Sequence, residues 1–594
     1  MLQTLGQAWL WTLPTTAIRH VGICRGSAPR TLFKMGGNMS LVASPAPEAG
    51  TLSNIDPHRY TSGRWLHRDE LQRKSRYIKF DFPALCQRSV ELVSGARSLV
   101  HCEKMEGGFN RVFIMTMDNG GKIVARLPSR IAGPRKLTTN SEVATMTYLK
   151  TFTSIPVPKI LDWSDDDSNP IGAEYIIMEN VAGVRLHERW TSMNTPEHMQ
   201  CTKALSLLVK KMVQIDFPAY GSLYFTDAIE PGLRVEFAEG YCVGPHCGSQ
   251  YWNCDPGEKD LYGDRNTNHG PWKTLPSYCT GLVQTGCARL PKMESEEQSP
   301  YRGSVNEHLR LLRISEAVIE ELAKSPLVQR AAAPILFHND FHKRNVFVSD
   351  EDPTVVTAII DWQATSIEPA FIFANEHPDF AELPDDVSFL GDGKEETKEE
   401  IKLKEDASIC AQTFEVCIRG YAPKLWAARA LDATLFRPFR YCHTSWRDGA
   451  AAVQQELIEV SQQWTKLGLP GPCPYQPTEE ELTGHKKQYQ DFEDAHKMRL
   501  AVMRTLDVSS DGWVQTDRWE EVAPAHQRMY EMWLDSVKES LASGEDELTL
   551  DQAKEMWPFD GVEDVNPPMY AEVPANHFSS KAPSSSEPVG ENIV

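Results

Sequence analysis

Two apolar runs lie between Arg111 and Leu127, separated by a short polar stretch. The runs are "RVFIMTM" and "KIVARL", and "DNGG" stands between them. Runs rich in β-branched and aromatic residues favour strands, and Asn and Gly tolerate the positive φ angles of a tight turn. The pattern predicts an antiparallel hairpin. "EGGFN" precedes it, and Gly107 and Gly108 there predict either a backbone turn that approaches a phosphate or a plain structural turn.

The spacing then changes to that of a helix. "TTNSEVATMTYLK" opens with capping residues, and the apolar positions from Val143 to Leu149 recur at helical intervals. Glu142 falls in the first turn, where the helix dipole alone would favour a carboxylate. "SIPVPKILDWS" and "EYIIMENVAG" follow as an extended segment and a buried strand that ends at a hinge-like Gly183. Residues 76–182 are therefore predicted to form a small mixed α/β unit.

Amphipathic helices dominate the chain beyond this unit. One clear pattern places apolar residues at Leu205, Leu208, Val209, Met212 and Val213, and another runs from Leu311 to Leu322. The predicted fold class is α+β, with a small lobe that holds an antiparallel sheet and one helix and a larger, mostly helical lobe. The predicted ranges are a leader at 1–45, a linker at 46–75, the small lobe at 76–182, the helical lobe at 183–550 and a mostly disordered tail at 551–594.

The composition limits the kinds of partner that this chain is expected to bind. The 594 residues are 41% hydrophobic and 24% charged, which is ordinary for a globular chain. A formal net charge of -21 repels phosphate backbones, so nucleic acid is not expected as a partner. No run approaches the roughly 20 apolar residues of a spanning helix, so no integral membrane segment is expected. The 13 cysteines include no CxxC pair and indicate reduced thiols.

The first residues depart from this acidic average. No Asp or Glu precedes Glu48, whereas Arg19, Arg25, Arg30 and Lys34 do. Cations among Ser, Thr and apolar residues predict a mitochondrial transit peptide. A secretory signal is the rival, but it would place the cations before the apolar core. The remaining alternative is a disordered leader upstream of an internal start at Met35 or Met39.

Two stretches interrupt the helical lobe. The first, about 235–301, is rich in Gly, Pro, Asn and Cys and predicts an insertion ordered in part by aromatic residues. Its Cys242, His246, Cys247 and Cys254 are zinc-ligand types, but their spacing fits no familiar site and favours structural thiols. The second, about 376–406, is an acidic loop. Its carboxylates suit either a cationic hydroxylated small molecule or a merely solvated face, and the second is favoured.

Three oxygen-bearing side chains stand at the ends of apolar runs. Asp340 and Asn345 lie five positions apart in "HNDFHKRNVF", and Asp361 ends the run "VVTAII". A short hairpin between Asn345 and Asp361 would return the second carboxylate to the first. Phosphoryl transfer from MgATP requires such a set, in which one carboxylate orients a hydroxyl and an amide oxygen with a second carboxylate holds Mg²⁺. Capping of turns would explain each aspartate alone, but not the joint pattern.

These motifs resemble those of the aminoglycoside phosphotransferase and choline kinase-like family, which has a bilobal protein-kinase-like fold. "HNDFHKRNVF" is similar to the family's H-G-D-x-H-x-x-N loop, and "IIDWQ" to its I-D-W-E. "GGFNRVF", "NHGPW", "SWRDGAAAVQQELI" and "DGWV" resemble a fungal subgroup. The resemblance covers most of the chain from about Arg76 to Val537.

The resemblance implies a role for each matching position. Asp340 would be the catalytic base, and Asn345 and Asp361 the Mg²⁺ ligands. The ATP-binding residues would be Gly107 and Gly108 over the phosphates, Arg126 on the α- and β-phosphates, its helix partner Glu142, and Ile177, Met178 and Glu179 at the adenine. Two positions depart from the family: Arg126 replaces a lysine, and Asn339 replaces a glycine. Arginine keeps the charge but offers a planar fork.

Three functions fit these features. The first is transfer of the ATP γ-phosphate to the hydroxyl of a small molecule. The second is a pseudokinase that binds a nucleotide or a partner with little or no turnover, which the two departures favour. The third, a protein kinase, ranks lowest because "IIDWQ" lacks D-F-G and no A-P-E follows. Retention of Asp340, Asn345 and Asp361 favours the first.

Overall fold

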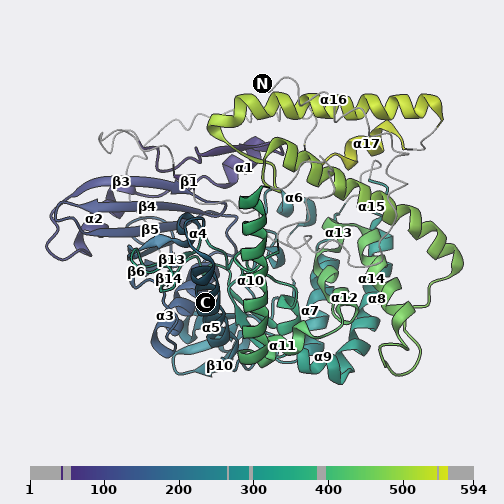
Figure 1. The fold of residues 1–594 in the computed structure, drawn as a ribbon, viewed down its shortest axis with the longest axis horizontal. Helices are drawn as coiled ribbons and strands as arrows, with labels where there is room; N and C mark the ends of the chain where they lie inside the picture. The colour runs from purple at the N-terminus through teal and green to yellow at the C-terminus, as the bar shows by residue number, and fades with distance from the viewer. Residues whose placement is uncertain are drawn as a thin grey trace, which may run out of the picture.

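The computed structural model describes residues 55–263, 267–292, 299–383, 397–544 and 548–559, and the backbone of β1 (Val42–Ala43). The rest of the predicted leader, the middle of the acidic loop and the tail from residue 560 lie outside the described residues. The molecule has a sheet-based lobe at one end and a helical lobe at the other (Figure 1).

The small lobe is built on a six-stranded antiparallel sheet with the order β1-β3-β4-β5-β7-β6. The predicted hairpin is confirmed, because Asn110 pairs with Pro128 and Thr116 with Lys122. The strands are β3 (Leu99–Glu106), β4 (Asn110–Met117), β5 (Lys122–Pro128), β6 (Ile160–Ser164) and β7 (Tyr175–Glu179).

Two helices accompany this sheet, one more than expected. The predicted helix is α3 (Leu137–Phe152), and the additional one is α2 (Phe82–Glu91). The side chain of Asp81 accepts the backbone N–H of Ala84 and caps α2, with a proline in its first turn. Leu85 then joins the sheet residues in one buried cluster. Aspartate before a proline is a recognised start signal, so the sequence did contain the evidence for α2.

The helical lobe is assembled from pairs of packed helices. α5 (Thr195–Val213) packs on α10 (Lys398–Tyr421), α7 (Leu275–Ala288) on α8 (Val305–Lys324), and α14 (Ala450–Gln463) on α15 (Glu479–Leu506). Both helices predicted from their apolar spacing are therefore present, as α5 and α8. The shorter helices are α4 (Leu186–Trp190), α6 (Glu258–Tyr262), α9 (Pro326–Ala331), α11 (Pro423–Arg429), α12 (Arg437–Tyr441) and α13 (Ser445–Asp448).

Short antiparallel sheets join these helices to the other lobe. β13 (Val346–Val348) and β14 (Val356–Ile359) form the predicted hairpin, and β8 (Val184–Arg185) extends it. β12 (Pro334–Phe337) pairs with β15 (Ser366–Pro369). β9 (Ser222–Phe225), β10 (Val235–Ala238) and β11 (Tyr241–Gly244) form a three-stranded sheet, so the range predicted as an insertion contains strands as well as α6 and α7.

Residues near the two ends of the described chain meet. β2 (Gly63–Trp65) pairs with β16 (Trp513–Gln515), and α1 (Asp69–Ser75) follows β2 within the range predicted as a linker. α16 (Trp519–Ser543) and α17 (Leu550–Met556) complete this region, and α16 runs along one long side of the molecule beside α15 (Figure 1).

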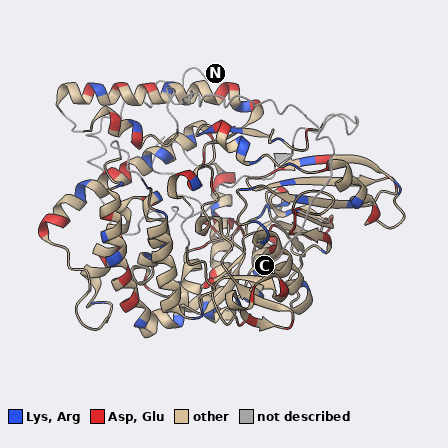
Figure 2. Cartoon of the chain, turned by 180° about the vertical axis from the view of Figure 1, so that it is seen from behind, with Lys and Arg blue, Asp and Glu red and all other residues tan. Residues whose placement is uncertain are grey.

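The charges are mixed rather than segregated on these helices. Acidic and basic residues both occur along α15 and α16, although the first turn of each helix is acidic (Figure 2). Among the helices that the structure describes, none has the length and apolar character to cross a bilayer. The observed sheet lobe and helical lobe confirm the predicted α+β bilobal class.

Candidate active site

The β13–β14 hairpin brings Asp361 back to Asn345. The backbone N–H of Ile360 donates to the carbonyl of Asn345 at 2.9 Å, so the chain arrives at Asp361 directly beside the loop that carries Asp340. Asp361 itself has a φ of 64°, a left-handed conformation that costs of order 1–3 kcal/mol for a residue with a side chain. The fold holds this strained conformation at the point where the sequence predicts a metal ligand.

Asp340 and Asn345 are joined within one tight loop. Nδ2 of Asn345 donates to the carbonyl of Asp340 at 3.1 Å and to its Oδ2 at 3.2 Å. The amide is thereby oriented, and its Oδ1 accepts no hydrogen bond from the described residues. Asp340, with its side chain 48% exposed, remains open to a ligand.

Arg126 forms ion pairs with two carboxylates, one in its own lobe and one in the helical lobe. From β5, its Nη1 lies 3.0 Å from Oδ1 of Asp361, and its Nη2 contacts Oε2 of Glu142 on α3. Arg126 and Glu142 are buried, whereas the Asp361 side chain is 35% exposed. Burial lowers the pKa of Arg126, and the neighbouring Asp361 opposes that shift. The planar guanidinium suits this bridge, because it can serve two carboxylates with separate N–H groups.

Two histidines flank Asp340. His338 is buried, its Nδ1 accepts the backbone N–H of Asp340 at 3.1 Å, and its Nε2 lies 2.9 Å from the carbonyl of Ile360. This arrangement places the ring proton on Nε2 and fixes the loop that carries Asp340 against the end of β14. His342 lies on the other side, with Nε2 3.0 Å from Oδ2 of Asp340.

This environment keeps Asp340 ionised. Burial acts to raise the pKa of Asp340, but the hydrogen bond and charge of His342 outweigh it, with smaller contributions from His338 and Asn345. The pKa of Asp340 is therefore below its ordinary value. Burial conversely acts to lower the pKa of His342, and Asp340 raises it above its ordinary value. A carboxylate in this state can accept a proton at neutral pH.

The two family departures have structural partners. Nδ2 of Asn339 donates to the carbonyl of Ala364 at 2.5 Å, which ties the loop that carries Asp340 to the segment after Asp361. Glycine could not make this bond. Arg126, the other departure, forms the double ion pair described above.

The glycine turn reaches the same segment through a pair of amides. The backbone N–H of Gly107 donates to the carbonyl of Asn110 at 3.0 Å and closes the turn between β3 and β4. Nδ2 of Asn110 then donates to Oε1 of Gln363 at 2.8 Å, and the return bond is 3.3 Å long. Sequence reasoning gave no role to Asn110 and Gln363, although they lie within the motifs "EGGFN" and "IIDWQ".

The residues predicted to contact adenine lie in the interior strand β7. Ile177 and Met178 pair with β5 on one side and β6 on the other, and the Ile177 side chain is fully buried in the sheet core. Oε1 of Glu179 accepts the backbone N–H of Lys159 at 2.8 Å. The backbone of β7 is thus engaged as far as Glu179.

The cysteine-rich stretch is packed within the helical lobe. Nε2 of the buried His246 lies 2.7 Å from Oε1 of Glu368, and Oγ of Ser222 lies 3.3 Å from Sγ of Cys247. Within the described residues, no three His, Cys, Asp or Glu side chains are grouped as metal ligands. All the cysteines described are free thiols.

The oxygen donors of the site fit a hard cation. Oδ1 of Asn345 and Oδ2 of Asp361 form no hydrogen bond with the described residues, and amide and carboxylate oxygens are the ligands that Mg²⁺ prefers. The structure therefore brings together Arg126, Glu142, Asp340, Asn345 and Asp361, with the glycine turn attached through Gln363.

Comparison with known proteins defines the class. Residues 102–372, which carry the whole site, match the family model described as the phosphotransferase enzyme family. The predicted resemblance is confirmed.

The relatives are fungal. A subtelomeric hrmA-associated cluster protein of Aspergillus fumigatus is 26% identical over 511 residues, which cover 78% of this chain and 97% of that protein. Altered inheritance of mitochondria protein 9 of Yarrowia lipolytica is 23% identical over 563 residues, covering 85% of this chain and 94% of that protein. Proteins of the same name in Saccharomyces cerevisiae and Kluyveromyces lactis are 21% identical, and these mitochondrial relatives support the predicted mitochondrial location.

Solved structures have low sequence identity and low TM-scores when compared with this chain. Plasmodium vivax ethanolamine kinase has a TM-score of 0.28 and 14% identity, covering 61% of this chain and 79% of that chain. An ADP-bound aminoglycoside phosphotransferase, APH(2'')-Ib, has a TM-score of 0.29 and 12% identity, covering 63% and 98%.

Proposed function

We propose that this protein is an ATP-dependent phosphotransferase that transfers the γ-phosphate to a hydroxyl group of a small molecule in mitochondria. The observation that carries the proposal is the convergence of five polar side chains from separate elements. Arg126 bridges Glu142 and Asp361, while Asn345 is bonded to Asp340 next to them. Capping or surface solvation would not place a strained Asp361 beside a buried arginine.

Each side chain has a role in the transfer. Asp340 accepts the proton of the attacking hydroxyl, because it is ionised and its side chain is half-exposed. The hydroxyl oxygen bonds to the γ-phosphorus as the bond to the bridging oxygen breaks, and ADP leaves. Arg126 contributes charge at the phosphates, and Glu142 holds it in place. The glycine turn encloses the phosphates with its backbone.

Asn345 and Asp361 are the residues that would hold Mg²⁺. When bound, the ion neutralises phosphate charge and orients the γ-phosphate. Asp361 would serve both Arg126 and the metal. Arg126 lies at Oδ1 of Asp361, so Oδ2 would remain for the metal. Positioning and charge neutralisation dominate such reactions, because the transition state is loose and needs little covalent help.

The second candidate is a nucleotide-binding protein without turnover. The 3.0 Å pair between Arg126 and Asp361 favours it, since this cation competes with the metal for the same carboxylate. Both candidates bind nucleotide, and only the first consumes it.

Calorimetry of MgATP binding to the full chain, combined with an assay of phosphate transfer, distinguishes the two candidate functions. We expect Mg²⁺-dependent binding by the wild type, its loss in Asp361→Ala, and its retention in Asp340→Ala with loss of phosphate transfer. Asp350→Ala, in the exposed loop between β13 and β14, is the matched control and should behave as the wild type.

The outcomes are distinct. Failure of the wild type to bind MgATP would overturn both candidates. Binding by Asp361→Ala at the wild-type affinity would overturn the site assignment. Binding without transfer to any hydroxylated acceptor in a screen would leave the second candidate.

A further inference from the structure

We propose that Arg76 is a positioning residue for the nucleotide, because it orders the glycine turn from a support built by both ends of the described chain. This inference rests on the proposed function for its nucleotide, but the ordering of the turn can be measured without one. The support comprises residues 59–76 and 507–519 and is called the terminal clasp below.

Arg76 touches the glycine turn directly. Its Nε donates to the carbonyl of Gly108 at 2.9 Å. Its Nη1 donates to the carbonyl of Gln72 at 3.0 Å and to the side-chain Oε1 of the same residue at 2.6 Å. The guanidinium lies 4.1 Å from the ring centroid of Trp65, and Arg76 as a whole is only 5% exposed. Its head group therefore has one orientation, aimed at the turn.

The residue beneath Arg76 is fixed by the distant part of the chain. Trp65 ends β2 and pairs with Trp513 of β16. Its Nε1 donates to Oδ2 of Asp511 at 2.9 Å, and the next backbone N–H, of Leu66, donates to the carbonyl of Gly512 at 2.8 Å. The platform on which Arg76 rests thus requires the segment that follows α15.

A second attachment fixes the clasp to the strand before the turn. Glu106, at the end of β3, is buried and accepts the backbone N–H groups of Thr61 and Ser62, each at 2.7 Å. Its charge is balanced by Lys104 at 3.0 Å and Arg111 at 3.1 Å. These bonds join the clasp to both strands that flank the turn, since Lys104 lies on β3 and Arg111 on β4.

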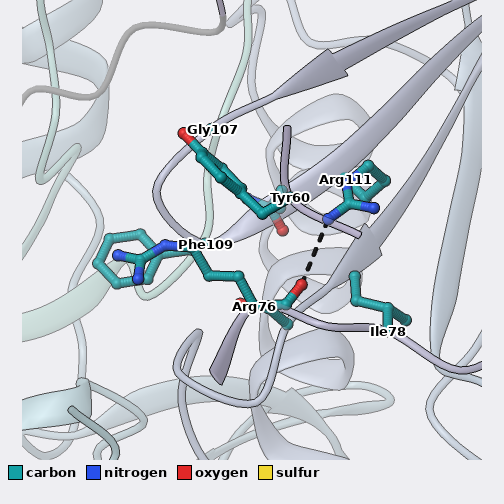
Figure 3. Close-up of a pocket in the computed structure, with 8 residues that line it drawn as sticks. Tyr60, Arg76, Ile78, Gly107, Phe109 and Arg111 are labelled. Carbon is teal, nitrogen blue, oxygen red and sulfur yellow. Dashed lines mark hydrogen bonds between the residues drawn. The ribbon is translucent and has the colours of Figure 1, made fainter. Parts of the chain in front are cut away.

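The clasp and the turn are in direct contact. Figure 3 shows the carbonyl of Arg76 directed at the guanidinium of Arg111, a hydrogen bond of 3.3 Å. A small hollow lined by Tyr60, Arg76, Ile78, Gly107, Phe109 and Arg111 has no room for a water molecule. The hollow is a packing gap and not a ligand site.

The expected effect of Arg76 on nucleotide binding follows from the conformational freedom of glycine. Two adjacent glycines lose more conformational entropy on ordering than any other pair, and a loop that orders only when ligand arrives weakens binding by that amount. Arg76 restricts the turn before the nucleotide binds. Removal of a charged hydrogen bond of this kind corresponds to about a 10- to 100-fold loss of affinity.

Arg76→Met tests the proposal in the full chain, because methionine keeps the apolar stem and removes the donors. Arg64→Met is the matched control: Arg64 belongs to the same clasp and lies 4.1 Å over the ring of Trp519, but the glycine turn is not among its contacts. The first measurement is amide hydrogen exchange of residues 107–110 without nucleotide. We expect at least tenfold faster exchange in Arg76→Met and no change in Arg64→Met.

The second measurement is the Kd for MgATP, followed by KM and kcat. We expect Arg76→Met to raise Kd and KM for ATP about 10- to 100-fold with kcat at saturating ATP nearly unchanged, and Arg76→Lys to recover part of the loss. Asp511 contacts Trp65 and not the glycine turn. Asp511→Ala should therefore raise the Kd for MgATP by less than Arg76→Met does.

Each outcome has one meaning. Unchanged exchange in Arg76→Met overturns the ordering of the turn, whatever the nucleotide data show. Faster exchange with an unchanged Kd overturns the positioning role. Equal losses in Arg76→Met and Arg64→Met, with equal falls in thermal midpoint, would show general destabilisation and also overturn it. Absence of MgATP binding in the wild type is the failure of the proposed function, and the exchange result then still decides whether Arg76 orders the turn.

Discussion

Arg126 serves two carboxylates at once, and the energetics of this arrangement depend on burial. Glu142 has a side chain only 1% exposed, so its removal leaves Arg126 with the partly exposed Asp361 alone. Breaking a buried pair by removing one partner costs about 3–5 kcal/mol, because the remaining charge stays desolvated.

Glu142→Gln should therefore lower the denaturant midpoint of the small lobe by the equivalent of about 3–5 kcal/mol and raise the KM for ATP. Chemical denaturation with steady-state kinetics measures both effects. Glu70→Gln is the control, since Glu70 and Lys74 form an exposed pair on α1, and it should leave both values unchanged. An unchanged midpoint in Glu142→Gln would show that the buried pair contributes nothing net.

His342 sets the acid limit of the proposed reaction. Asp340 has a lowered pKa, so its ionised form and the stability that this form contributes persist above its ordinary pKa and are lost as pH falls through the lower folded value. Burial acts to raise the pKa of Asp340, so removal of His342, the largest lowering influence, should raise that pKa.

His342→Phe should move the acid limb of the pH profile of kcat/KM to higher pH. His101→Phe, at an exposed position on β3, should leave it in place. An acid limb that stays fixed in His342→Phe would mean that the group titrating in the free enzyme is not Asp340.

At this scale the sequence predicted the candidate residues, and the structure shows which partners surround them. Asp340, Asn345 and Asp361 were predicted because their order and spacing are local. The partners Asn110, Gln363 and Arg76 were not predicted, because each acts through a residue far away in the chain. The roles of Ile177, Met178 and Glu179 remain predictions, and their place in an interior strand points to backbone groups beyond Glu179 for any adenine contact.

Among the elements, the amide pair between Asn110 and Gln363 links the glycine turn to the segment after Asp361. If the pair acts as one unit, the effects of substituting its two members on the free energy of MgATP binding should not be additive. Asn110→Ala and Gln363→Ala are each expected to raise the Kd for MgATP several-fold, as expected for a lost hydrogen bond, and the double variant no further.

Calorimetry of the double-mutant cycle measures this coupling. Asn119→Ala, in the β4–β5 turn, is the control and should bind as the wild type. Strictly additive effects would mean that the two amides act independently.

Gly183 was predicted as a hinge, and its surroundings indicate close packing instead. It has a φ of 97°, and a Cβ there would lie 2.1 Å from the carbonyl oxygen of Val348. Gly172 also has a positive φ, of 76°, but a Cβ there would meet nothing within 4 Å.

Gly183→Ala should lower the thermal midpoint well below that of Gly172→Ala, since Gly172→Ala carries only the backbone cost of about 1–3 kcal/mol. Thermal unfolding of the two variants checks this. Equal midpoints would show that β8 and β13 separate easily enough to accept a side chain, as a free hinge would.

Elements with strong local periodicity were predicted correctly, namely the β4–β5 hairpin, α3, α5 and α8. The pairing of β2 with β16 was not, because strand pairing over a long sequence separation leaves no periodic signal in either short segment. The linker predicted at 46–75 rested on composition alone, and that range contains β2 and α1.

No disulfide bond cross-links the described part of the molecule. All the cysteines described are free, and burial raises the pKa of many of them, including Cys442 to about 12. Thiols with raised pKa values react slowly. The thermal midpoint should therefore be the same with and without reductant, as scanning calorimetry can check. A midpoint that falls with reductant would reveal a disulfide.

The terminal clasp also bears on the order in which the protein is made. Trp65 and Asp511 are 446 positions apart, so a growing chain carries its glycine turn, Asp340 and Asp361 long before the partner of β2 has been synthesised. A product that stopped after α15 would contain every residue of the proposed site from Gly107 to Asp361 and still lack the platform under Arg76. For this chain, the presence of every proposed site residue does not amount to a complete proposed site until translation has passed β16.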